Sequence, residues 1–222
     1  MKRLMRWIPL LLLSGCASIG AMQTADTLGQ GKMQVGLEYS EQASFSRDTL
    51  TLYPMVGTSV RVGVWDWLDA GLRVGPSGAE VQPKVRFTKK GSPLIISVAP
   101  SFGVTLLDTN GLELRFYNLG IPVLFGVPVS GGHQWVFSAR FNDTIAYESA
   151  GSARGLLHLM TASVSAGFAV RVWKMMIMPE LAVGTPLWTV SERTDVEGGV
   201  DFGAGRTTVQ LNLAVMFGGT KP

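Results

Sequence analysis

The sequence predicts an all-β fold, a single closed antiparallel β-barrel of about ten strands. Apolar and polar residues alternate at every second position through most of residues 32–218, which is the pattern of a strand with one apolar face. Glycine is abundant, with 27 among 222 residues. Charged residues make up 16%, well below the roughly 25% of an ordinary soluble domain. Eight and twelve strands are the alternative counts.

Ten segments carry the alternation. They span residues 32–40, 50–64, 70–74, 80–87, 94–105, 112–127, 134–142, 160–170, 177–184 and 208–217. Most provide the roughly 9 to 11 residues that a tilted membrane strand needs. Residues 69–88 decide whether the number of strands is even or odd, because one long strand there in place of two would make the number odd. Within residues 112–127 the apolar positions pass from even to odd numbers, so we predict a β-bulge near Phe116 or Tyr117.

Alternation alone leaves open which face of the barrel is apolar. A soluble lipocalin-like barrel has its apolar face inside, whereas a transmembrane up-and-down barrel has it outside. Charged residues at mid-strand on the polar face favour the transmembrane barrel, because a polar lumen accommodates them. Since an unpaired buried charge is costly, we expect these charges to pair and to fill the lumen. The predicted lumen charges are Glu38, Arg61, Arg73, Glu80, Lys84, Arg86, Glu113, Arg115, Arg140 and Glu180.

Aromatic residues and loop lengths also separate two ends of the predicted barrel. Tight turns lie beside four tryptophans, Trp65, Trp67, Trp135 and Trp173. Longer polar loops at 41–49, 146–155 and 188–206 lie beside Tyr39, Tyr53, Tyr147 and Trp188. Two aromatic girdles around an apolar band, with short turns on one side and long loops on the other, are typical of a barrel in the outer membrane.

The N-terminus is typical of a secretory signal. Lys2, Arg3 and Arg6 precede a short apolar stretch at residues 7–13, and residues 1–15 are too short for a permanent membrane helix. The sequence Leu13-Ser14-Gly15-Cys16 contains the chain's one cysteine and resembles a bacterial lipobox. This resemblance implies cleavage before Cys16 and lipidation of its thiol. Ala17 after the cysteine resembles the pattern of lipoproteins that are sorted to the outer membrane. Residues 16–31 are then the lipidated cysteine and a linker.

Removal of the signal changes the charge of the chain. The 19 lysines and arginines fall to 16, which equals the 16 aspartates and glutamates, so the mature chain is neutral. A nucleic-acid-binding surface therefore has no support from charge.

The segment that ends at Phe217 has apolar residues at every second position. It is similar to the terminal strand of bacterial outer-membrane β-barrel proteins, although the tail at 219–222 departs from that pattern. The resemblance implies outer-membrane lipids and lipopolysaccharide as surroundings, and the barrel-assembly and lipoprotein-sorting machineries as partners.

The two histidines are the candidates for chemistry. Outer-membrane barrel lipases and lipid A deacylases resemble each other in using a histidine with a serine near the bilayer surface. His158 has Ser152 and Glu148 as candidate partners at the external rim, but no motif surrounds it. His133 falls in the turn Ser130-Gly131-Gly132-His133. Two histidines far apart make a poor metal site, and we predict no catalytic site, cofactor or metal.

An acidic stretch marks the last long loop, with Glu192, Asp195, Glu197 and Asp201. We interpret it as a solvated external loop, with divalent cations that bridge lipopolysaccharide as the alternative. The leading interpretation of function is a lipid-anchored outer-membrane barrel with a structural, adhesive or narrow-conduit role. The alternatives are an outer-membrane lipid A or phospholipid hydrolase, and a lipid-anchored lipocalin-like carrier.

Overall fold

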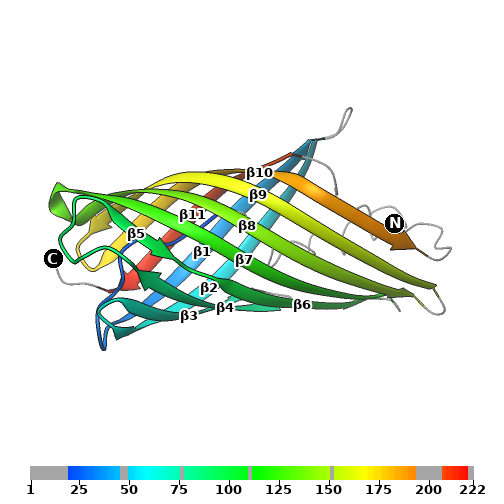
Figure 1. Ribbon diagram of the computed structural model, residues 1–222, viewed down its shortest axis with the longest axis horizontal. Helices are drawn as coiled ribbons and strands as arrows, with labels where there is room; N and C mark the ends of the chain where they lie inside the picture. The colour runs from blue at the N-terminus through cyan, green and yellow to red at the C-terminus, as the bar shows by residue number, and fades with distance from the viewer. Residues whose placement is uncertain are drawn as a thin grey trace.

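The computed structural model describes residues 20–45, 50–75, 78–109, 112–150, 153–193 and 207–219. The chain folds into tilted antiparallel strands around one barrel (Figure 1). The strands are β1 (Met33–Phe45), β2 (Leu50–Trp65), β3 (Leu68–Gly75), β4 (Gly78–Arg86), β5 (Ile95–Val98), β6 (Ser101–Thr109), β7 (Leu112–Val129), β8 (His133–Ala150), β9 (Ala153–Val172), β10 (Met175–Arg193) and β11 (Thr208–Gly218). Over the described ranges no helix has the length and apolar character to cross a membrane.

The sheet closes because β1 pairs with β11. β5 and β6 share one position in the barrel, since each pairs with both β4 and β7. They form one interrupted strand, so the barrel has ten strands, as the alternation predicts. β3 and β4 are separate strands of a hairpin, which settles the parity in favour of an even number.

The apolar face of the barrel points outward and the polar face points inward. Val62 and Leu213 are among the exposed apolar side chains, whereas Lys84, Asp69 and Gln210 are buried in the lumen. This arrangement is the inverse of a lipocalin, so the carrier alternative is wrong. The outer face instead matches the apolar band of a transmembrane barrel.

The two ends of the barrel differ less than predicted. The predicted loop at 146–155 is wrong, because β8 continues to Ala150 and β9 begins at Ala153. β1 and β10 also extend into the predicted loops at 41–49 and 188–206, as far as Phe45 and Arg193. A longer described connection, residues 87–94 between β4 and β5, lies at the end with the tryptophans.

At the end with the tryptophans the other connections between strands are short: Asp66–Trp67, the 3₁₀ turn Ser130–Gly132 and Trp173–Lys174 (left in Figure 1). Trp65 stacks on Trp67 there, with ring centroids 5.3 Å apart. We call this the turn end, and the opposite end the loop end. Tyr147 and Trp188 are exposed toward the loop end. The side chain of Tyr53 lies outside the described residues.

The predicted bulge in β7 is wrong. β7 pairs with β8 in unbroken register from Leu112 to Val129, and its pairing with β6 is also unbroken. The apolar positions change from even to odd numbers for another reason: Leu114 is apolar but points into the lumen. Glu113 and Arg115 therefore lie on the outer face. Register shifts occur instead between Gly63 and Trp65 and between Pro186 and Trp188.

The outward face gives a test of membrane burial. We expect Leu213→Arg to lower the free energy of unfolding by about 2–4 kcal/mol, because a charge near the bilayer midplane is poorly solvated. Val209→Arg, on the same face of β11 and four residues nearer the loop end, is the control and should lose only about 0–1 kcal/mol. Denaturant titration in lipid vesicles measures both. Equal losses would show that Leu213 does not face the hydrocarbon.

Candidate functional site: a lumen occupied by the N-terminal segment

Residues 20–28 run inside the barrel, and residues 29–31 lead from there to β1; we call residues 20–31 the plug. The sequence predicted a linker from the anchor to the barrel here, but residues 20–25, 27 and 28 are buried. The plug joins β1 at the turn end, where the Gly31 amide donates to the Gly63 carbonyl at 2.8 Å. The Gly63 amide in turn donates to the Lys32 carbonyl at 2.8 Å. A segment of small and polar residues fits a narrow polar lumen, which is why its composition resembles that of a linker.

Glycines in the barrel wall make room for the plug. A Cβ at Gly63 would overlap the carbonyl oxygen of Gly29. A Cβ at Gly126 would stand 2.7 Å from the Cβ of Ala25, closer than real Cβ atoms approach. The wall and the plug therefore fit each other at two levels of the lumen.

Basic side chains of the wall bind carbonyl groups of the plug. Lys84 Nζ donates to the carbonyls of Thr24 at 3.1 Å and Asp26 at 2.5 Å. Arg140 Nη1 donates to the Gly20 carbonyl at 3.2 Å. These are hydrogen bonds from charged donors in a buried setting, each worth about 1.5–3 kcal/mol.

Acidic and amide side chains bind N–H groups of the plug. The two oxygens of Glu180 accept from the amides of Ala21 and Met22, each at 2.8 Å. Asp69 accepts from the Leu28 amide at 3.0 and 3.2 Å. Gln134 Oε1 accepts from the Ala25 amide at 3.0 Å. The wall thus satisfies backbone groups that an unpaired segment would otherwise bury without partners.

The same wall residues also pair with each other. Arg73 Nε lies 2.7 Å from Glu38 and its Nη1 lies 3.5 Å from Glu80. Lys84 Nζ lies 3.3 Å from Asp69, and Arg140 lies 3.7 Å from Glu80. The predicted charge pairing is therefore present, but the plug as well as the ion pairs fills the lumen.

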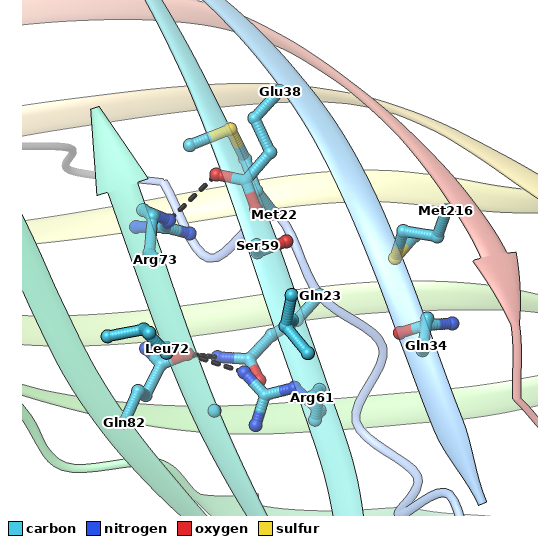
Figure 2. A pocket seen from close by; sticks show the side chains of 12 residues that line it. Met22, Gln23, Gln34, Glu38, Ser59, Arg61, Leu72, Arg73, Gln82 and Met216 are labelled. Carbon is cyan, nitrogen blue, oxygen red and sulfur yellow. Dashed lines mark hydrogen bonds and ion pairs between the residues drawn. The ribbon is translucent and has the colours of Figure 1, made fainter. Parts of the chain in front are cut away.

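A small cavity remains between the plug and strands β1–β4 (Figure 2). Gln82 Oε1 accepts from Arg61 Nη2 at 2.6 Å and from Gln23 Nε2 at 3.0 Å, as the dashed lines show. Gln23 Oε1, Arg61 Nη1 and Gln82 Nε2 are buried beside it without a protein partner. A water molecule in this polar cavity would satisfy such groups.

Apolar residues of the plug pack into two patches of the lumen. Met22 contacts a cluster of Val136, Ala169, Met178, Ala214 and Met216. Ala21 and Ala25 contact a cluster of Ile95, Ala99 and Leu124. These patches give the plug hydrophobic as well as polar binding energy.

The structure gathers most of the predicted lumen charges around the plug. The side chains that lie inside the barrel are Glu38, Arg61, Arg73, Glu80, Lys84, Arg86, Arg140 and Glu180. Arg86 pairs with Asp26 of the plug at 2.5 Å. Glu113 and Arg115 differ from the expectation, because they pair with each other on the exposed outer face. Cys16 lies outside the described residues.

Sequence reasoning missed Asp69. The predicted strand began at residue 70, but the inward positions of β3, Gly71 and Arg73, continue two residues back to Asp69. Sequence reasoning also missed the plug itself, because a segment without regular secondary structure has no periodic pattern to detect.

Within the described residues, the two histidines make no contact of the kind that the hydrolase alternative requires. His158 lies on the outer face, where its Nε2 is 2.5 Å from Asp143 Oδ1 and its ring packs edge-on against Trp188. Glu148 points into the lumen instead, and Ser152 is outside the described residues. Neither contact of His158 supplies a hydroxyl nucleophile. At the turn end, His133 Nδ1 accepts from the Arg171 amide at 3.0 Å.

No protein-family model and no curated protein matches the chain. Similar solved structures are bacterial outer-membrane β-barrels. Neisserial surface protein A aligns with 83% of this chain and 96% of its own length, at 10% identity and a TM-score of 0.43. Ail of Yersinia pestis aligns with 85% of this chain and 99% of its own length, at 7% identity and a TM-score of 0.41. The outer-membrane protease OmpT of Escherichia coli aligns with 84% of this chain and 95% of its own length, at 5% identity and a TM-score of 0.45. At such identities the likeness concerns the barrel fold alone.

Proposed function

We propose that this chain is an outer-membrane β-barrel closed at rest by its own plug, with a structural or adhesive role rather than that of an open pore. The observation that carries this proposal is the set of buried hydrogen bonds from Lys84, Glu180 and Asp69 to the plug backbone. An open conduit requires a continuous water path, and here backbone occupies the lumen that a ten-stranded barrel encloses.

Closure predicts the electrical behaviour of the wild-type protein. Purified full-length protein inserted in planar bilayers should show little or no steady conductance. Insertion is verified separately by heat-modifiable mobility in gels, because a closed membrane barrel resists detergent until it is boiled. A large and stable conductance from verified barrels would contradict the proposal.

We further propose that Cys16 anchors the chain to the membrane through acyl chains. The support is the Leu13-Ser14-Gly15-Cys16 sequence directly behind a short apolar stretch. Two or three acyl chains bind a membrane firmly, since each buried methylene contributes about 0.8 kcal/mol.

Metabolic labelling tests the anchor. Cells grown with a clickable fatty acid should label the wild-type chain and leave Cys16→Ser unlabelled. Labelling of both to the same extent would refute lipidation at this residue.

A further inference from the structure

The wall of the lumen recognises the plug mainly through its backbone. Glu180 accepts from two successive amides, Lys84 donates to two carbonyls, and Ser97 Oγ donates to the Ala25 carbonyl. Such contacts recognise a peptide backbone in a bent, irregular conformation, with Met22 at a positive φ, rather than one particular sequence. Peptide-binding proteins use main-chain hydrogen bonds in this way for affinity, and side-chain pockets for specificity.

We propose that the lumen is a binding site for a peptide in the irregular conformation of the plug, and that the plug is its tethered ligand. A separate peptide of suitable sequence binds in the same place when the plug leaves. This goes beyond closure of the barrel, which requires only that the plug be inside.

The wall also defines which peptides fit. Ala21 and Ala25 must be small, because Gly126 and the cluster of Ile95, Ala99 and Leu124 surround them closely. The position of Asp26 requires a carboxylate, which Arg86 binds at 2.5 Å. The preferred ligand therefore has two small residues four positions apart, followed directly by an acidic residue.

The charges of the wall argue for a peptide against a polyanion. Donors and acceptors alternate along the lumen: Arg140 and Lys84 face carbonyls, while Glu180 and Asp69 face amides. A peptide backbone presents both kinds of group at each residue, whereas a polyphosphate or nucleic acid would meet two buried carboxylates.

The test uses the full-length chain with its own plug displaced. Ala25→Trp cannot fit beside Gly126, and it leaves the barrel wall unchanged. The probe is a fluorescent synthetic peptide of residues 20–28. We expect saturable binding to folded Ala25→Trp, and block of the conductance that this variant shows. Wild-type protein is the control and should not bind, since a tethered plug competes at an effective concentration of about millimolar.

A second peptide, N-methylated at Ala21, Met22 and Ala25, tests backbone recognition. It cannot donate to Glu180 or Gln134, so its binding should be at least tenfold weaker. Equal binding of both peptides, or an open barrel that binds neither, would overturn the inference while closure by the plug still stands. If Ala25→Trp fails to fold, Gly63→Ala replaces it, because residues 20–28 do not include Gly29. If both variants fold and still conduct no ions, the plug is not what closes the barrel, and the proposed function fails as well.

Discussion

Lys84→Met is expected to destabilise the barrel by about 3–5 kcal/mol. Lys84 is 1% exposed and pairs with Asp69, which is 0% exposed, while donating to two carbonyls of the plug. Removing the ammonium group leaves a buried carboxylate without its cation, and breaking a buried pair from one side is strongly destabilising. Urea titration in detergent micelles measures the free energy of unfolding.

Arg115→Met is the matched control for this substitution. Its partner Glu113 is 47% exposed and Arg115 itself is 52% exposed, and Arg115 is in register with Tyr147, so their ion pair lies outside the lumen beside the aromatic residues of the loop end. We expect a loss of about 0–1 kcal/mol. The double variant Lys84→Met/Asp69→Asn should recover part of the loss, because the buried charge is gone and the Asn carbonyl still accepts from Leu28. Equal losses for Lys84→Met and Arg115→Met would contradict the buried lumen network.

Gly63→Ala is expected to open the barrel. The added methyl group would overlap the carbonyl oxygen of Gly29, and Gly63 also exchanges two backbone hydrogen bonds with Gly31 and Lys32. The plug cannot enter the lumen past this point without moving the wall. The variant should therefore show conductance steps in planar bilayers under conditions in which the wild type is silent.

Gly57→Ala on the same strand is the control for this effect. A Cβ at Gly57 has its nearest neighbour at 3.5 Å, an ordinary contact with the Val74 carbonyl. It should leave the barrel closed. Conductance from both variants would point to a general loosening of β2, and conductance from neither would show that the plug does not depend on this glycine.

The alternation of residues was sufficient to predict the barrel and its ten strands, and the mid-strand charges together with the aromatic residues indicated that the apolar face points outward. Each strand obeys a local rule with a period of two, because successive side chains point to opposite faces. The rule failed in β7, where Leu114 faces the lumen although it is apolar. An apolar residue inside a barrel breaks the correlation between polarity and face, and no local signal marks it.

The plug could not be predicted in the same way. Its burial depends on partners far away in the sequence, such as Glu180 for Ala21 and Gln134 for Ala25. Nothing in the residues of the plug themselves distinguishes it from a linker. The lumen charges offered an indirect signal, because ten predicted charges in one lumen need more hydrogen-bond partners than they can supply to one another. Counting backbone groups as such partners would have suggested an internal segment.

Cross-linking between the plug and the wall tests the central claim most directly. The variant carries Ala25→Cys and Gly126→Cys with Cys16→Ser, so that it has two thiols. The Cβ positions stand 2.7 Å apart, and a slight displacement of the plug brings them to the roughly 3.5–4.5 Å of a disulfide. We predict that mild oxidation links these residues in the folded barrel and changes its mobility after denaturation. A variant pairing Ala25→Cys with Leu213→Cys on the outer face should stay unlinked. Absence of the first link from correctly folded protein, or equal linking of both pairs, would contradict a plug inside the lumen.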